Sequence, residues 1–128
     1  MKWIVGIVMS WAVCGCASMQ SQRTNEVNHV VVCWLKQPGD AGARRQLIDR
    51  SYTFLEIPGC RRVVAGPVLP STRPAVDASF DMAVVMTFSD EQALVSYYTN
   101  PIHVRAVEEV LKPLVARYVA YDFTGAAR

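Results

Sequence analysis

The sequence predicts an α+β domain with a ferredoxin-like β-α-β-β-α-β order, that is, a four-stranded antiparallel sheet with both helices on one face. Two observations carry this prediction. Short apolar, β-branched runs with the length of strands occur at residues 29–35, 60–69, 80–88 and 118–123. Stretches with helical spacing of apolar residues separate the first run from the second and the third from the fourth. This order usually arranges the strands as 4-1-3-2.

The composition is that of one globular domain. The chain has 128 residues, of which 52% are hydrophobic and 19% charged, unlike a disordered chain. The formal net charge is +2, and the basic residues are scattered without interleaved aromatic residues, so we expect no nucleic-acid partner. We divide the chain into a lipoprotein-type signal peptide at 1–15, a lipidated cysteine and tether at 16–28, a folded domain at 29–124 and a tail at 125–128.

The N-terminal segment has the pattern of a targeting signal. Lys2 precedes an apolar run, Trp3 to Val13, that is too short to span a bilayer as a helix. The run ends in Val13-Cys14-Gly15-Cys16, which resembles the lipobox of bacterial lipoproteins. Two alternatives stay open: an ordinary secretory signal with incidental cysteines, and an uncleaved N-terminal anchor.

The lipobox resemblance implies cleavage before Cys16 and lipidation of that residue, which makes the membrane a partner. Stable anchoring requires more than one acyl chain, and the resemblance implies more than one on Cys16. Ala17 follows instead of Asp, which by the same analogy implies the outer membrane of a Gram-negative cell envelope, facing the periplasm. Residues 18–28 are polar and without periodicity, which is typical of a tether.

The first strand, residues 29–35, lacks a clean alternation of apolar and polar residues, so we expect both of its faces to be buried. Period-two alternation divides it into one face with His29, Val31, Cys33 and Leu35 and another with Val30, Val32 and Trp34. Helices cover only one face of this sheet. We therefore predict a homodimer packed sheet to sheet, which would cover the second face.

The first helix begins after Asp40, which can cap it, and ends before Pro58-Gly59. Its predicted inner face carries Leu47, Ile48, Ser51, Tyr52 and Leu55. The charged residues nearby fall mostly on the opposite face, which is typical of a solvated helix surface rather than a binding patch.

The second helical region is punctuated by caps and prolines. Ser89 and Gln92 have the spacing of a capping box. Asn100 followed by Pro101 restarts the helix at a new angle. Pro113 predicts a kink or a stop near residues 111–112, because proline removes a helical hydrogen bond.

The two cysteines of the body, Cys33 and Cys60, fall on strands that are not neighbours in the predicted sheet. With strands ~4.8 Å apart, their Cα atoms would lie roughly 10 Å apart, too far for a disulfide. We predict two buried free thiols. There is no Cys-x-x-Cys pair to build a zinc site, so we expect no metal and no cofactor.

The segment 97–103 holds the strongest candidates for a functional site. His103 lies in the first turn after Pro101 and opens an apolar stripe, so its side chain should face inward. The positive end of the helix dipole disfavours protonation there, which predicts a neutral imidazole. With Tyr97 six residues earlier, it can be part of a site, or equally a core histidine bonded to a carbonyl oxygen.

Six short motifs in register resemble the Dabb family, the stress-responsive dimeric α/β barrel domain. They are His29-Val30-Val31-Val32, Ile57-Pro58-Gly59, Phe88, Tyr97 before Asn100-Pro101-Ile102-His103, Lys112-Pro113-Leu114 and Tyr121-Asp122-Phe123. The resemblance implies a ferredoxin-like fold and a dimer whose sheets form a barrel. The lipobox and the Pro-rich loop at 67–74 depart from the family pattern.

The resemblance also implies site residues. One plant member is a polyketide cyclase that uses the tyrosine and histidine of this signature, which match Tyr97 and His103. By the same comparison His29 lines the pocket, and Asp122 matches an acidic position at the end of the last strand. We do not expect a lipid-anchored domain of the cell envelope to encounter a polyketide product. The resemblance therefore does not predict polyketide cyclase activity for this chain.

Three functions stay open. The first is binding of a small hydrophobic molecule between sheet and helices, in a pocket whose polar groups are His29, Tyr97 and His103. Its expected lining is Val31, Cys33, Leu47, Tyr52, Leu111 and Asp122. The second is an enzyme of cyclase or isomerase type, with His103 as base, Tyr97 as hydrogen-bond donor and His29 as orienting group. The third is a structural or stress-related dimeric module without catalysis.

Overall fold

The computed structural model describes residues 25–126. The predicted signal peptide, the lipidation of Cys16 and most of the tether lie outside the described residues. Within them, no helix has both the length and the apolar character needed to cross a membrane.

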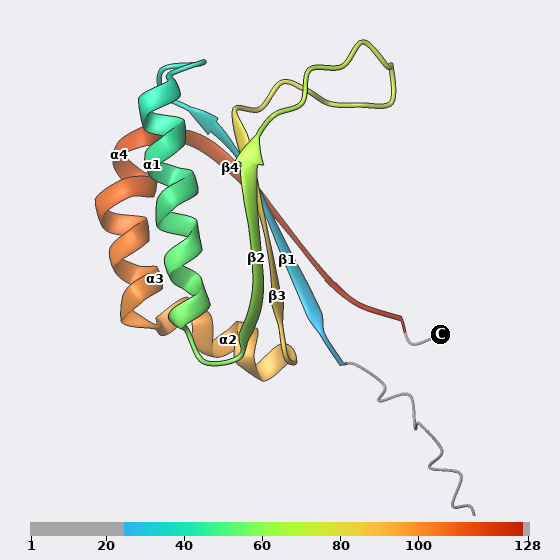
Figure 1. Ribbon diagram of the computed structural model, residues 1–128, viewed down its shortest axis with the longest axis vertical. Coiled ribbons are helices and arrows are strands. Elements are labelled where there is room, and N and C mark those ends of the chain that lie inside the picture. Colours follow the sequence, from blue (N-terminus) through green and yellow to red (C-terminus); the bar gives the residue numbers. More distant parts are fainter. Residues whose placement is uncertain (1–24, 127–128) are drawn as a thin grey trace, which may run out of the picture.

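The described chain folds as one sheet with its helices packed on a single face (Figure 1). The element order confirms the predicted β-α-β-β-α-β arrangement, with short additional helical turns. The elements are β1 (Val27–Leu35), α1 (Ala41–Tyr52), η1 (Thr53–Glu56), β2 (Cys60–Pro67), β3 (Met82–Phe88), α2 (Glu91–Thr99), α3 (Pro101–Ala106), η2 (Val107–Leu111), α4 (Lys112–Leu114) and β4 (Val115–Thr124).

The sheet has the strand order β2-β3-β1-β4, which is the predicted order, and each neighbouring pair is antiparallel. Val31 in the middle of β1 pairs with Val84 on β3 and with Ala120 on β4. The strand at residues 27–35 begins two residues earlier than predicted, so the tether ends before Val27.

The face of β1 that points toward the helices is buried at every second residue, from Val27 to Leu35. The core continues on β3, where Met82, Met86 and Phe88 are almost completely buried. The residues between them on β1 are only half-buried in the single chain. The predicted division of β1 into two faces is therefore confirmed, and the helix-free face is the less covered one.

The helix-free face of the sheet is largely apolar. Its register places Val30 opposite Tyr121 and Val32 opposite Val119. Tyr121 and Phe123 on the edge strand β4 remain 60% and 55% exposed. In Figure 1 no helix of residues 25–126 lies on this face, and the loop after β2 projects beyond its upper end. We call this surface, with Val30, Val32, Val64, Tyr121 and Phe123, the outer face.

Two of the three predicted caps are present. The Asp40 carboxylate accepts from the Ala43 N–H at 3.0 Å, and the Asn100 side chain accepts from the Ile102 N–H at 2.9 Å. The predicted Ser89–Gln92 capping box is wrong. Asp90 caps α2 instead, accepting from the Ala93 N–H at 2.8 Å, because its carboxylate is one residue nearer to the first helical turn.

Pro113 widens its helix where a kink or stop was predicted. Val107–Leu111 forms a π-helical turn, in which the Lys112 N–H donates to the Val107 carbonyl five residues back. Proline has no N–H for the carbonyl four residues before it, so the ordinary α-helical pattern is interrupted at this point. The helix ends at Leu114, and β4 starts at Val115, three residues earlier than predicted.

Both cysteines of the described chain are free thiols. Cys33 on β1 is buried, and burial raises the pKa of its thiol to about 11. Cys60 at the start of β2 is only half-buried, so the prediction of two buried thiols is wrong for this residue. β3 lies between their two strands, in accordance with the argument against a disulfide.

Candidate functional site

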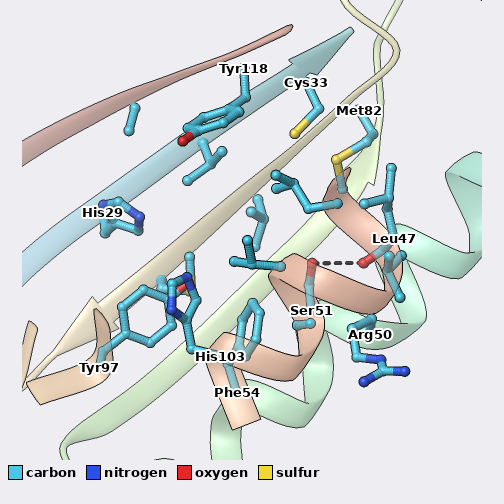
Figure 2. A pocket seen from close by; sticks show the side chains of 18 of the residues that line it. His29, Cys33, Leu47, Arg50, Ser51, Phe54, Met82, Tyr97, His103 and Tyr118 are labelled. Atoms are coloured by element: carbon cyan, nitrogen blue, oxygen red, sulfur yellow. Dashed lines mark hydrogen bonds between the residues drawn. The ribbon is translucent and has the colours of Figure 1, made fainter. Parts of the chain in front are cut away.

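A cavity of about 280 Å³ lies between the inner face of the sheet and the helices. Figure 2 shows its wall, built from β1, β3 and β4 on one side and from α1 and the α2–α3 region on the other. Most of the lining is aliphatic or sulfur-containing. The π-helical turn contributes Val107, Val110 and Leu111 to the wall, so the widening of this helix helps to shape the cavity.

Four predicted lining residues lie on the wall, namely Val31, Cys33, Leu47 and Leu111. Tyr52 does not. The buried stripe of α1 runs through Ala43, Leu47 and Ser51, and Tyr52 is one position further round the helix. It is 43% exposed, and its hydroxyl lies 3.4 Å from the Ala65 carbonyl oxygen on β2.

Leu55 was also predicted on the inner face, and this is wrong. The helix α1 ends at Tyr52, and the tighter turn η1 changes the direction of the side chains that follow. Phe54 is buried and lines the cavity, whereas Leu55 is 48% exposed.

Tyr97 and His103 meet at one end of the cavity, as Figure 2 shows. Their ring centroids are 4.1 Å apart. The Asn100 cap and Pro101 turn the chain between α2 and α3, and this brings the end of one helix against the start of the next. Phe54 packs against both rings, at 5.4 Å from Tyr97 and 6.0 Å from His103.

Within residues 25–126, His103 has one hydrogen-bond partner. Its Nδ1 lies 3.2 Å from the carbonyl oxygen of Tyr98. Burial lowers the pKa of His103, and the nearby His29 lowers it further, although the bond to the Tyr98 carbonyl acts in the opposite direction. The neutral imidazole was predicted from the helix dipole, but α3 is short, and burial is the main cause.

His29 is held by Asp122. The two residues are register partners on β1 and β4, and His29 Nδ1 lies 2.5 Å from Asp122 Oδ1. His29 is only 4% exposed and lines the cavity, whereas the side chain of Asp122 is about half exposed and is not part of the wall. Asp122 was predicted to contact a ligand; its place in the structure is that of a group that orients His29.

Tyr97 is protonated at ordinary pH. Burial raises the pKa of its hydroxyl strongly, with smaller contributions from Tyr98 and Cys60. The hydroxyl can therefore donate a hydrogen bond into the cavity.

Tyr98 and Tyr118 line the cavity and were not predicted as site residues. The ring centroid of Tyr98 is 5.8 Å from that of His29 and 6.0 Å from that of His103. Burial is the main cause that raises the pKa of Tyr98, and the negative charge of Asp122 raises it further. Tyr118 pairs with Cys33, so it shares the inner face with Ala120 and Asp122. Period-two alternation back from Asp122 could have identified Tyr118. Tyr98 had no such signal, because neighbouring helical positions rarely share a face.

Among the described residues that line the cavity, the cationic side chain is Arg50, which is paired with Glu109 at 3.0 Å. Within residues 25–126, no three His, Cys, Asp or Glu side chains gather closely enough to hold a metal ion. The chemistry that these residues offer is therefore hydrogen bonding and proton transfer by imidazole and phenol groups.

Fold and site together define a ferredoxin-like α+β domain with an internal cavity that has polar groups at one end. Residues 27–125 match the model of the stress responsive A/B barrel domain, Dabb, and the chain belongs to this family. No curated protein matches the chain.

Several solved structures share the fold. A Dabb family protein from Mesorhizobium loti is 23% identical, with a TM-score of 0.62 over 78% of this chain and 96% of its own. A dimeric protein of unknown function from Bacteroides fragilis is 18% identical, with a TM-score of 0.64 over 80% and 99%. Hydroxynitrile lyase from Passiflora edulis is 19% identical, with a TM-score of 0.63 over 82% and 97%. At these identities the comparison establishes the fold alone.

Proposed function

We propose that this protein binds a small, mainly apolar molecule in the cavity between its sheet and its helices. The observation that carries the proposal is the cavity itself. Its walls are mostly apolar, and its few polar side chains gather mainly at one end, as in small-molecule sites.

The volume limits the size of the ligand. Ligand pockets usually measure about 300 to 1,000 Å³, and this cavity of about 280 Å³ is at the lower end. A molecule with one small ring and a short alkyl chain fits this volume better than a long lipid chain.

Propylbenzene, which has no polar group, is a suitable probe of the cavity. We expect it to shift the NMR signals of wall residues in the full-length chain and to raise the melting temperature. Ala106→Met should fill part of the cavity and weaken binding, because Ala106 is buried on its wall. Ala116→Met, at an exposed position on β4, is the matched control. Equal binding by both variants, or no binding by the wild type, would contradict the proposal.

A second candidate function is an enzyme of cyclase or isomerase type. It is favoured by the 4.1 Å contact between Tyr97 and His103, which sets a phenol donor beside a neutral imidazole base. His29, held by Asp122, would then orient the substrate. The bond from His103 to the Tyr98 carbonyl is equally suited to a packed, non-catalytic histidine, as in a structural module.

We also propose that the protein works as a homodimer, with the outer face of one sheet packed against that of a second copy. Relatives with this fold are described as dimeric. The exposed Tyr121 and Phe123 would be covered in such a pair.

The lipobox supports a further proposal, that the mature chain is anchored through Cys16 in the envelope of a Gram-negative bacterium. We expect metabolic labelling with an alkyne fatty acid to tag the wild type and not Cys16→Ser. The Cys14→Ser variant is the control and should remain labelled. Labelling that survives in Cys16→Ser would contradict the proposal.

A further inference from the structure

The hydrogen-bond partners of His103 determine which of its ring nitrogens is free. Its Nδ1 lies 3.2 Å from the Tyr98 carbonyl oxygen. A carbonyl oxygen can only accept, so Nδ1 carries the proton and donates it. In a neutral imidazole the other nitrogen, Nε2, is then an acceptor. Burial of the ring favours this neutral form by lowering the pKa.

The acceptor nitrogen is not enclosed by protein. Throughout residues 25–126, each buried side-chain nitrogen or oxygen has a hydrogen-bond partner. His103 makes its hydrogen bond to this part of the chain through Nδ1 alone. Its Nε2 is therefore reachable, and the ring lies on the cavity wall.

Tyr97 supplies the complementary group. Tyr97 is only 2% exposed, and its ring centroid lies 4.1 Å from that of His103 (Figure 2). The hydroxyl keeps its proton, since burial raises the pKa of Tyr97. One acceptor and one donor thus stand side by side at the same end of the cavity.

From this pair we infer that the ligand carries a hydroxyl group, which donates to His103 Nε2 and accepts from the Tyr97 hydroxyl. A hydroxyl is both donor and acceptor, so it satisfies both partners at once. An ether can only accept and leaves the imidazole nitrogen without a partner. This inference rests on the proposed function, because it names the class of molecule that the cavity takes.

A carboxylate fits this end of the cavity poorly. It can only accept, so it has no proton for the imidazole nitrogen, and the neighbouring Asp122 has the same charge. Arg50, the cation on the wall, is paired with Glu109 and lies apart from His29 and Tyr97 in Figure 2. The ligand class is therefore a small neutral phenol or alcohol with an apolar body.

Three probes of nearly equal shape test the inference on the full-length chain: 4-propylphenol, its methyl ether 4-propylanisole, and 4-propylbenzoate. We expect the phenol to bind about tenfold more tightly than the ether, as the loss of one or two buried hydrogen bonds predicts. The benzoate should bind more weakly still. Dissociation constants from NMR titration at neutral pH give both ratios.

Two variants separate the role of the imidazole from packing. His103→Leu removes the acceptor and should reduce the preference for phenol over ether to near unity. Phe54→Leu alters the same cluster without a polar atom, so it should weaken both probes alike and keep the ratio. Should His103→Leu not fold, the ¹⁵N shift of Nε2 in the wild type is a second measurement, and it should move with the phenol and not with the ether.

The outcomes distinguish the inference from the proposed function. Tighter binding of the phenol, lost in His103→Leu, supports both. Equal binding of phenol and ether, or tighter binding of the benzoate, overturns the hydroxyl inference and leaves the binding function intact. Binding of none of these probes nor of propylbenzene overturns both.

Discussion

His29 on β1 and Asp122 on β4 face each other across an antiparallel strand pair, with Nδ1 and Oδ1 2.5 Å apart. The contact joins two residues that are 93 positions apart in the chain. A carbonyl or carboxylate beside one ring nitrogen sets the proton position and the orientation of a histidine. In this way the edge strand fixes the imidazole that the central strand presents to the cavity.

Loss of this partner should destabilise the protein. Asp122→Ala leaves the buried His29 without its acceptor, and we expect the free energy of unfolding to fall by about 1 kcal/mol. Urea denaturation measures the change. Asp49→Ala is the control, because it breaks an exposed pair with Arg45, and its effect should stay within about 0.5 kcal/mol. Equal losses in the free energy of unfolding would show that the His29–Asp122 contact stabilises the protein no more than an exposed ion pair does.

His103 should make stability dependent on pH. Its pKa in the folded state is lowered, so the unfolded chain binds more protons as the pH falls below the ordinary value of about 6.5. The stability that His103 contributes is complete above about pH 6.5. It is lost as the pH falls through the lower pKa that His103 has in the folded state. Urea midpoints between pH 7.5 and 5 should decrease, and His103→Gln should flatten the slope. His29 and the tyrosines nearby remain in both proteins, so the difference isolates His103. A slope unchanged by the substitution would contradict the prediction.

Tyr97→Phe separates a binding protein from an enzyme. The variant keeps the ring contacts with His103, Phe54 and Phe88 and removes only the hydroxyl. If the protein only binds, affinity for the ligand should fall by about 1 kcal/mol. For an enzyme that uses Tyr97 as a donor to a developing negative charge, turnover should fall by roughly 10²-fold or more, with little change in substrate binding. Titration and rate measurements on the same hydroxylated compounds distinguish the two.

Gly59 is required by the approach of α2. It has a φ of +85°, and a Cβ there would lie 2.5 Å from the Cβ of Ala93. Gly39 has a similar φ of +78° with nothing within 4 Å of a Cβ, which makes it a matched control. We expect Gly39→Ala to cost about 1 kcal/mol for the left-handed backbone alone, and Gly59→Ala to cost clearly more. Because α2 carries Tyr97, Gly59→Ala should also perturb the NMR signals of the cavity. Equal costs would refute the steric argument.

A single charged substitution on the outer face tests whether this face forms the dimer interface. Val32 lies at the centre of this face, between Ala83 on β3 and Val119 on β4. A carboxylate there would be buried without a partner in a sheet-to-sheet dimer, so Val32→Asp should produce a monomer. Light scattering after size exclusion gives the mass. Gln46→Asp, at an exposed position on α1, should leave the mass unchanged. A wild type that is already monomeric would rule out the dimer.

Much of the fold could be predicted because it depends on residues close together in the chain. Asp40 and Asn100 cap their helices through amides two or three residues away, and both were visible as sequence motifs. The two faces of β1 follow from the alternation of a single strand. The errors were local as well: Asp90 competed with Ser89 for one helix end, and a tighter turn after Tyr52 exchanged the directions of Phe54 and Leu55.

By itself, then, the sequence determined the element order, the inner face of β1 and the pairing of Tyr97 with His103 across a helix break. Only the tertiary structure decided which polar side chains come together at the cavity and which of their atoms are free. The partnership of His29 with Asp122, the place of Tyr118 and the free nitrogen of His103 depend on strand register and on packing between distant segments. A shift of one residue in that register would turn Asp122 and Tyr118 together to the opposite face of the sheet, because successive side chains of a strand alternate between its two faces.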